Sequence, residues 1–326
     1  MEISGGFMAV VAVVAGLVFI LVGANILTDG AAAIARRFNI SNLVIGLTVV
    51  AFGTSAPELV VSVVSAMNGS SDLAIGNVVG SNIFNTLLIV GCTAAIVPLF
   101  IQKSTLTIEI PLCILASFIL IFCANDMLLD GSQSNVISRS DGLLLLCFFI
   151  IFFGYTLAIA RNGNEEEGEQ IKEMPLWKSI AFVLMGLAGL IYGGQFFVDG
   201  SSAIARSIGV SESVIGLTLV AGGTSLPELA TSVVAALKKN SNMAIGNIIG
   251  SNLFNIFLIL GATSVIHPLN IQGITLLDFG VMAGSCILLC FLGLLPKRQV
   301  LSRWKGLVLL LCFVIYMTYL VMPIGN

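Results

Sequence analysis

The chain contains the same stretch of sequence twice. Residues 41–102 align with residues 211–272 without a gap, at a constant offset of 170 positions. Within this stretch, GLTVVAFGTSAPE at 46–58 matches GLTLVAGGTSLPE at 216–228 in ten of thirteen positions. A similarity of this length indicates an internal duplication. We therefore expect the chain to fold as two copies of one structural unit.

Most of the chain is apolar. Of its 326 residues, 57% are hydrophobic and 10% are charged, and the mean hydropathy is +1.07, whereas soluble domains carry about 25% charged residues. A membrane-spanning helix needs about 20 mostly apolar residues. Ten such runs are present, near 7–27, 40–66, 72–97, 105–123, 142–160, 177–198, 211–237, 242–266, 274–295 and 304–323. The first run lacks the basic flank and cleavage site of a signal peptide. The sequence predicts an all-α polytopic membrane protein with ten transmembrane helices.

Basic residues are distributed unevenly among the loops. With the N-terminus outside, twelve Lys and Arg residues fall in inner loops and two in outer loops, as the positive-inside rule requires. We therefore expect both termini outside and the acidic segment 161–176 to be a cytoplasmic linker. The offset spans five helices, an odd number, so the second copy would cross the membrane in the opposite sense. The prediction is two inverted five-helix repeats, 1–160 and 177–326, an architecture typical of transporters.

Two glutamates occupy equivalent positions inside predicted helices. An ionisable side chain at the centre of a spanning helix costs about 2.5–3.5 kcal/mol on insertion scales, so Glu58 and Glu228 are candidates for function. The repeat can bring both carboxylates together at the centre of the protein, where they would favour a divalent cation. The alternative is a protonated, hydrogen-bonded carboxyl, which would have to occur twice in register.

Hydroxyl groups follow the glutamates at helical spacing. Calcium takes six to eight oxygen ligands. The hydroxyls that share a helical face with a glutamate are Thr54 and Ser62 around Glu58, and Thr224 and Ser232 around Glu228. The prolines before the glutamates, Pro57 and Pro227, should bend each helix and release a carbonyl four residues earlier. We expect these irregular stretches to turn carbonyls and the hydroxyls of Ser55 and Ser225 toward an ion.

A second motif supplies neutral oxygens on neighbouring helices. AIGNVVGSNIFN at 74–85 matches AIGNIIGSNLFN at 244–255. Each copy places a serine and an asparagine four residues apart, Ser81 with Asn85 and Ser251 with Asn255. Neutral amides suit a site that must release its ion. The alternative for these side chains is hydrogen bonding between helices, worth about 0.6 kcal/mol each.

Other acidic residues and the cysteines are weaker candidates. Asp29 and Asp199 are expected to end the first helix of each half, while Glu109 and Asp278 lie near predicted helix starts, where acidic groups are ordinary. The seven cysteines lie inside apolar runs without a CxxC pair. We expect them to be buried as small hydrophobic residues.

The motifs GTSAPE and GSNIFN, followed by GTSLPE and GSNLFN, resemble the paired alpha repeats of the calcium/cation antiporter superfamily, and most of all its prokaryotic sodium/calcium exchangers. The resemblance covers the whole chain. It implies adjacent calcium and sodium positions that are alternately exposed as the first and sixth helices slide over the other eight, so that sodium influx drives calcium out. By motif position, the implied metal ligands are Glu58, Glu228, Thr54, Ser55, Thr224, Ser225, Ser81, Asn85, Ser251, Asn255 and the backbone carbonyls of Ala51 and Ala221.

The second GSN motif departs from many relatives. Where many prokaryotic and potassium-dependent members of the superfamily carry an aspartate, this chain has Asn255. The site therefore has one fewer potential negative charge, and the resemblance implies exchange that does not depend on potassium. Electrostatic attraction is strong in a low-dielectric site. Losing one negative charge therefore makes it less favourable to fill every position with a metal ion. We expect water to fill one position.

Three other functions stay open. In a calcium/proton antiporter of the same superfamily, Glu58 and Glu228 would carry protons in place of sodium. A cation channel fits less well because broken helices and paired carboxylates favour occlusion over continuous conduction. An intramembrane metal-dependent enzyme would need a positioned nucleophile or histidine ligands.

We expect no catalytic residues, no cofactor and no nucleic-acid partner. The expected protein is a monomer in the lipid of a prokaryotic inner or plasma membrane, and it binds calcium and sodium.

Overall fold

The computed structural model describes residues 6–161, 174–208, 221–295 and 299–321, most of which are helical. The elements are α1 (Gly6–Arg37), α2 (Asn42–Ile45), η1 (Gly46–Val50), α3 (Ala51–Thr54), α4 (Ala56–Met67), α5 (Ser71–Ile83), η2 (Phe84–Ile89), α6 (Val90–Ile96), β1 (Leu99–Phe100), η3 (Thr105–Glu109), α7 (Ile110–Cys123), α8 (Asp126–Leu129), β2 (Asn135–Ile137), α9 (Arg139–Arg161), α10 (Leu176–Ser207), α12 (Ala221–Thr224), α13 (Leu226–Leu237), α14 (Ser241–Leu253), η5 (Phe254–Leu260), α15 (Gly261–Ile266), β3 (Leu269–Ile271), α16 (Leu276–Leu294), β4 (Val300–Leu301) and α17 (Arg303–Val321). The η segments are π-helices. Most of the predicted linker 161–176, and the start of the predicted span 211–237, lie outside the described residues.

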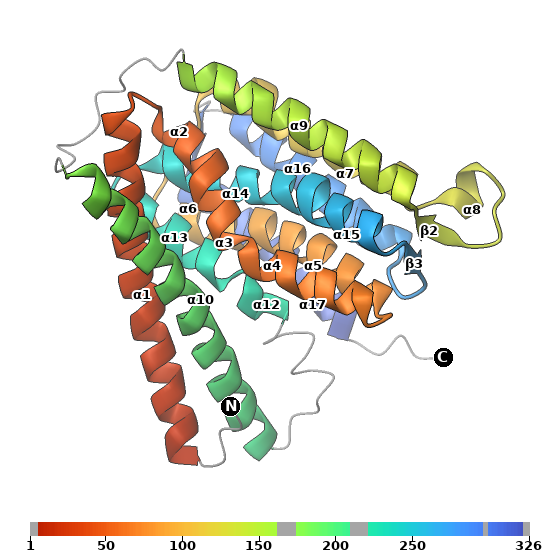
Figure 1. The fold of residues 1–326 in the computed structure, drawn as a ribbon, viewed down its shortest axis with the longest axis horizontal. Helices are drawn as coiled ribbons and strands as arrows, with labels where there is room; N and C mark the ends of the chain where they lie inside the picture. The colour runs from red at the N-terminus through yellow and green to blue at the C-terminus, as the bar shows by residue number, and fades with distance from the viewer. Residues whose placement is uncertain (1–5, 162–173, 209–220, 296–298, 322–326) are drawn as a thin grey trace.

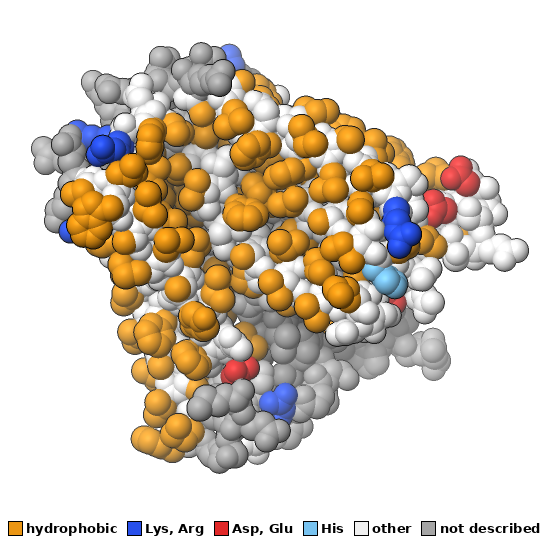
Figure 2. Space-filling view, viewed as in Figure 1, with side chains coloured by type: hydrophobic (Ala, Val, Ile, Leu, Met, Phe, Trp, Pro, Cys, Tyr) orange, Lys and Arg blue, Asp and Glu red, His pale blue; other side chains and the backbone are white. Residues whose placement is uncertain are grey.

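The helices are long and apolar enough for a bilayer. Within the described ranges, eight helices meet this condition, and a ninth span is formed by Asn42–Thr54 and Ala56–Met67, which meet at 45°. The short apolar helix α13 is the described end of the predicted span 211–237. Large apolar side chains cover the outside, as Figure 2 shows for one face. A continuous apolar surface marks contact with lipid, so the chain is an integral membrane protein.

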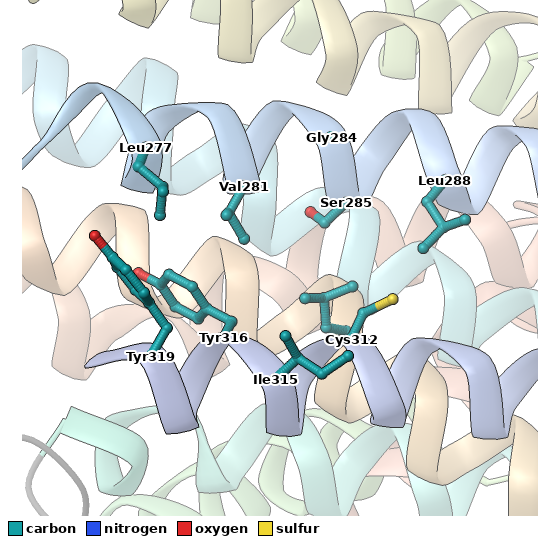
Figure 3. A pocket seen from close by; sticks show the side chains of 10 residues that line it. Leu277, Val281, Gly284, Ser285, Leu288, Cys312, Ile315, Tyr316 and Tyr319 are labelled. Carbon is teal, nitrogen blue, oxygen red and sulfur yellow. The ribbon is translucent and has the colours of Figure 1, made fainter. Parts of the chain in front are cut away.

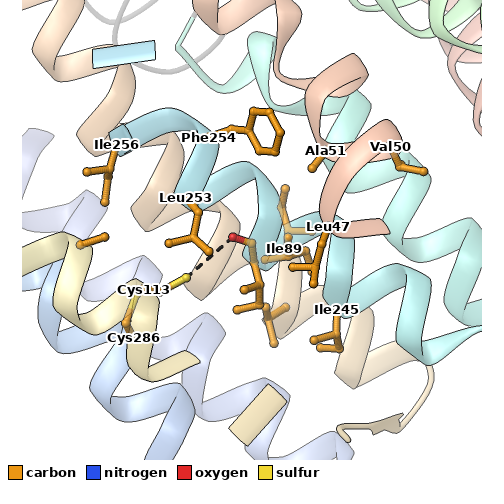
Figure 4. Packing of buried hydrophobic residues seen from close by; sticks show 14 of the residues in the cluster. Leu47, Val50, Ala51, Ile89, Cys113, Ile245, Leu253, Phe254, Ile256 and Cys286 are labelled. Atoms are coloured by element: carbon orange, nitrogen blue, oxygen red, sulfur yellow. Dashed lines mark hydrogen bonds between the residues drawn. The ribbon is translucent and has the colours of Figure 1, made fainter. Parts of the chain in front are cut away.

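Two helical runs form the centre of the molecule. Over their most apolar windows, Ser71–Ile96 is 72% buried and Ser241–Ile266 is 94% buried, whereas α9 and α17 are each 17% buried. Figure 4 shows part of the core, in which Leu47, Val50 and Ala51 from the first half belong to one buried cluster with Ile245, Leu253 and Phe254 from the second. Both copies of the duplicated sequence therefore share a single core.

Two short antiparallel ribbons join the halves. β1 pairs with β4, with Leu99 opposite Leu301, and β2 pairs with β3, with Val136 opposite Asn270. β1 and β3 follow the two central runs, whereas β2 and β4 precede the last helix of each half. Accordingly, α9 packs on α15 of the other half and α17 packs on α6. The two copies are interlocked in space.

α1 and α10 form a separate pair that lies at a steep angle to the other helices (Figure 1). Their backbones touch at glycines. A Cβ added to Gly16 would lie 2.7 Å from the carbonyl oxygen of Gly193, and one added to Gly23 would lie 2.8 Å from that of Gly186. The partner numbers fall on one helix as they rise on the other, so the helices are antiparallel. We call this contact the glycine seam.

Two expectations were wrong. Asp29 and Asp199 do not end their helices, because α1 continues to Arg37 and α10 to Ser207; the alanine-containing segments that follow each aspartate are good helix formers. Not every cysteine is buried, since Cys147 is exposed on α9. Lipid accepts an apolar side chain as readily as the core does, so the apolar run could not show which way Cys147 faces.

Candidate cation site

The helices that carry the two glutamates are broken just before them. α3 ends at Thr54 and α4 begins at Ala56, and Ser55 between them has φ −84° and ψ 7°. α12 and α13 are separated in the same way by Ser225, with φ −91° and ψ 5°. A proline follows each break in the first turn, where its missing N–H leaves a carbonyl of the preceding turn without its helical donor. Both predicted breaks are confirmed.

Glu58 and Glu228 lie in the first turns of α4 and α13, and each is only 1% exposed. Peptide dipoles at a helix N-terminus stabilise a carboxylate by about 0.3–1 kcal/mol. This term is small beside the cost of removing a charge from water. Each carboxylate therefore depends on further partners.

The serine at each break bonds to the glutamate of the other half. Ser55 Oγ donates to Glu228 Oε1 at 3.0 Å, and Ser225 Oγ donates to Glu58 Oε1 at 3.3 Å. The two carboxylates are close enough to interact electrostatically. The structure thus brings both carboxylates together. Two charged carboxylates at this range repel each other unless a cation or protons compensate them.

The second motif lies directly beside the carboxylates. Ser251 Oγ donates to Glu228 Oε1 at 3.4 Å, and Ser81 Oγ lies within hydrogen-bond distance of Ser225 Oγ, at 3.2 Å. One turn further along are the two asparagines, each donating its amide across to the other half, Asn85 to Asn252 Oδ1 and Asn255 to Asn82 Oδ1, both at 3.1 Å. These asparagines stand on the π-helices η2 and η5, a helix form often found at functional sites.

Four buried oxygen atoms on these residues have no hydrogen-bond partner within the described chain: Glu58 Oε2, Glu228 Oε2, Asn85 Oδ1 and Asn255 Oδ1. Buried polar atoms are almost always paired, and an unpaired one costs about 1–3 kcal/mol. Carboxylate and amide oxygens of this kind are ligands that calcium accepts, and these four belong to the two glutamates and two asparagines of the paired motifs. Among the described residues, no group of three or more His, Cys, Asp or Glu could hold a metal, so neutral oxygens would supply most of the ligands.

The remaining predicted ligands lie next to this group. Thr54 is fully buried, and its Oγ1 donates to Asn247 Oδ1 at 3.2 Å. Thr224 is half-buried beside the Glu58 carboxylate. The carbonyl of Ala51 accepts from Ser55 N at 3.0 Å, so an ion would have to share that oxygen. Ala221 is the first described residue of α12.

Several asparagines of this network were not predicted from the sequence. Asn77 Nδ2 donates to Ser62 Oγ at 3.0 Å, and Asn247 Nδ2 donates to Ser232 Oγ at the same distance. Asn82 and Asn252, which accept from the predicted ligands, were missed as well. All four asparagines are identical between the repeats at the offset of 170 positions, and that identity could have found them.

A separate pocket of about 430 Å³ lies between α16 and α17 (Figure 3). Apolar side chains such as Leu277, Val281 and Leu288 line it, and its lining contains no carboxylate. Tyr316, at one end, donates its hydroxyl to Asp278 Oδ1 at 2.9 Å. This pocket is unsuited to a cation, whereas the buried carboxylates are suited to one.

Known proteins resemble the whole chain. The profile of the family described as sodium/calcium exchanger protein matches residues 8–158 and 178–322. The sodium/calcium exchanger MaX1 of Methanosarcina acetivorans is 32% identical over 339 aligned positions, covering 94% of this chain and 96% of that protein. The inner membrane protein YrbG of Escherichia coli (strain K12) is 37% identical over 276 positions, covering 80% and 81%.

Solved structures agree in fold. Structures of the sodium-calcium exchanger NCX_Mj, soaked with Na+ and Sr2+ or with Na+ and Ca2+, match with TM-scores of 0.81 and 0.80 at 33% and 34% identity. The matches cover 98% and 97% of this chain and 100% and 99% of those structures. On its sequence, its fold and its paired motifs, the chain belongs to the sodium/calcium exchanger family.

Proposed function

We propose that this chain is a secondary active antiporter that exchanges Na+ for Ca2+ across a prokaryotic inner or plasma membrane by alternating access. The observation that carries the proposal is the set of four unpaired buried oxygens on Glu58, Glu228, Asn85 and Asn255. They belong to both halves of the duplicated sequence and lie on elements that meet at the broken helices. An ion held there could be exposed to either side by moving the surrounding elements.

The ligand chemistry favours calcium and sodium. Two carboxylates balance one divalent cation, and calcium accepts hydroxyl, amide and carbonyl oxygens in a flexible geometry. In a calcium/proton exchanger the counter-ion itself would need only the two carboxylates, although calcium would still need further oxygen ligands. Here the serines 55, 225, 81 and 251 also gather around them. Sodium also takes oxygen ligands, so these hydroxyls support sodium as the counter-ion over protons.

We further propose ten spans arranged as two inverted repeats, 1–160 and 177–326, in a monomer with both termini outside and the 161–176 linker in the cytoplasm. The interlocked ribbons support this arrangement, because each half contributes its strands and its last helix to the other in the same way. The paired helices α1 and α10 would slide together over the core. Their backbone contact along the glycine seam supports movement as one unit.

Asn255 bears on the ions that are used. Its amide donates to Asn82, which leaves only its neutral Oδ1 for an ion. An aspartate there would add a third negative charge beside Glu58 and Glu228, which would favour one more monovalent cation. We therefore propose that exchange is independent of potassium and that water occupies one of the positions.

We expect calcium uptake into proteoliposomes loaded with sodium, and almost none when the interior holds choline. Potassium on either side should leave the rate unchanged once the membrane voltage is clamped. A proton gradient alone should not drive uptake, because protons satisfy the carboxylates but leave the hydroxyl and amide oxygens unpaired. Uptake driven equally by a proton gradient would support calcium/proton exchange and overturn the sodium proposal. Potassium stimulation would overturn only the argument from Asn255.

An ion pair between α1 and α13 gives a second test. Lys238, which follows α13, lies 2.6 Å from Asp29 on α1. The equivalent positions in the other half are Asn68 and Asp199, where no ion pair can form because asparagine is neutral. In a transporter built from inverted repeats, the two halves exchange their conformations when the protein turns from one side of the membrane to the other. In the opposite-facing conformation, Asp199 would therefore lie near Asn68, as Asp29 lies near Lys238 here. The ion pair therefore stabilises only the conformation described here, by about 0.5–1 kcal/mol for partly exposed side chains.

Lys238→Gln is expected to lower the ratio of the described conformation to the opposite-facing one about two- to fivefold, the factor that corresponds to a pair of this exposure. Asn68→Lys, which gives Asp199 a partner, should lower it by a similar factor, and Asp199→Asn added to Asn68→Lys should restore it. Distances between spin labels on α1 and α13 measure the populations. An Asn68→Lys variant with the wild-type distribution would contradict the inverted relation of the two halves.

A further inference from the structure

Asn247 on α14 connects the two halves beside the cation site. It is fully buried. Its Nδ2 donates to Ser232 Oγ at 3.0 Å and to the backbone carbonyl of Glu228 at 3.4 Å. Its Oδ1 accepts from Thr54 Oγ1 at 3.2 Å. One side chain therefore contacts both the helix that carries Glu228 and a predicted ligand from the other half.

The direction of these bonds matters for ion binding. A threonine hydroxyl has one proton and two lone pairs, and it can coordinate a cation only if the proton points elsewhere. Asn247 Oδ1 accepts that proton; the other acceptors within reach of Thr54 Oγ1 are the carbonyl of Ala51, at 3.3 Å, and the carboxylate of Glu228. Accepting the proton at Asn247 leaves the Glu228 carboxylate available to an ion, together with the lone pair of the Ala51 carbonyl that Ser55 N does not use.

The amide of Asn247 is held in the orientation that this requires. Its two N–H donors are satisfied on the α13 side, by Ser232 and by the Glu228 carbonyl, so its oxygen faces Thr54. Turning the amide over would place N–H groups against the Thr54 hydroxyl and leave Ser232 and the carbonyl without donors. Each such loss costs free energy in a buried site.

We propose that Asn247 is a positioning residue of the cation site, which orients the Thr54 hydroxyl so that its lone pairs face the ion. The inference rests on the proposed binding of Ca2+ by this site. Asn77 stands at the equivalent position of the first half and donates in the same way, to Ser62 Oγ at 3.0 Å and to the Glu58 carbonyl at 3.2 Å. By the symmetry of the repeat, the proposal extends to Asn77 as the positioning residue of that half, with Thr224 as the equivalent hydroxyl.

A purely structural role would be to join α13 and α14 without acting on the ion. A double-mutant cycle separates the two roles, because residues that act through one another are non-additive. Thr54→Val removes the hydroxyl that Asn247 orients and keeps the shape of the side chain. If Asn247 acts through Thr54, its replacement has nothing left to disturb in the Thr54→Val background.

The experiment measures the Ca2+ dissociation constant of the purified full-length protein by calorimetry, for the wild type, Asn247→Leu, Thr54→Val and the double variant. Asn247→Leu should raise the dissociation constant by up to about tenfold, the effect of one lost hydrogen bond between neutral groups. The double variant should match Thr54→Val alone. In liposomes, Asn247→Leu should raise the half-saturating calcium concentration and leave the maximal rate almost unchanged.

Additive effects in a wild type that binds calcium would overturn this inference alone. A wild type that binds neither calcium nor sodium would overturn the proposed function and the inference with it. If Asn247→Leu does not fold, Asn247→Ala takes its place in the cycle, because the smaller side chain leaves room for a water to satisfy Ser232. Asn77→Leu in the same assay should be non-additive with Thr224→Val and additive with Thr54→Val.

Discussion

Replacing Glu58 or Glu228 with glutamine is expected to abolish sodium-driven calcium uptake. Each carboxylate has one oxygen bonded to a serine of the other half and one buried oxygen without a partner. Glutamine keeps the size of the side chain and removes the charge. Removing one partner of a buried charge pair costs about 3–5 kcal/mol, so calcium affinity should fall by at least about 100-fold.

The chain offers a matched control for this substitution. Glu109 is also fully buried in a spanning helix and, among the described residues, also has one unpaired carboxylate oxygen, Oε2. Its other oxygen accepts a hydrogen bond from Tyr155 at 2.5 Å, and within the described chain no carboxylate of the other half bonds beside it in this part of the fold. Glu109→Gln keeps an oxygen for Tyr155 and should leave calcium binding and uptake close to the wild type. Calorimetry and uptake assays on the three variants test this. Uptake by Glu58→Gln at the wild-type rate would show that its carboxylate is not a ligand.

The duplicated motifs made the centre of the candidate site predictable, because the structure brings the two predicted carboxylates together. Glu58 and Glu228 stand out because a charge in an apolar helix is costly and because it occurs twice in register. The breaks at Ser55 and Ser225 are caused by the prolines two residues later. Proline disrupts a helix locally, so these breaks can be predicted without knowledge of the fold. Features decided by covalent chemistry, or repeated at one offset, can therefore be found in the sequence.

Features decided by tertiary contact could not be found in this way. Asn85 and Asn255 were predicted as oxygen ligands, but their bonds to Asn252 and Asn82 depend on how the two halves meet. The π-helices that carry them have no signal in hydrophobic periodicity. Likewise, the apolar runs ended near 27 and 198, while α1 and α10 continue to Arg37 and Ser207, because polar residues can extend a helix beyond its most apolar part.

The glycine seam is a third case of this kind. Glycines at 16, 23 and 30 recur every seven residues on α1, and those at 186, 193 and 200 recur on α10. The spacing alone allows contact with any neighbouring helix. Only the structure shows that the two rows face each other, because a Cβ on Gly200 would lie 2.7 Å from the carbonyl oxygen of Ala9 on α1.

Gly193→Ala is expected to destabilise the protein, whereas the same substitution at the adjacent Gly194 is not. A Cβ on Gly193 would lie 2.8 Å from the backbone nitrogen of Ile20, and one on Gly194 would lie 3.7 Å from its nearest neighbour, the carbonyl oxygen of Gly223. Backbone atoms on α1 cannot yield as a flexible side chain can, so the helices must separate. Overpacking of this kind costs about 1–3 kcal/mol.

The midpoint of thermal unfolding of the detergent-purified protein measures the difference. Gly194→Ala should leave it unchanged or raise it, because alanine in a helix is favoured over glycine by about 0.5–1 kcal/mol. Gly193→Ala gains the same helix propensity, so a lower midpoint must come from the seam. Transport should fall with it if α1 and α10 move as one unit, since separated helices slide independently over the core. Equal midpoints for the two variants would show that the seam can widen at no cost.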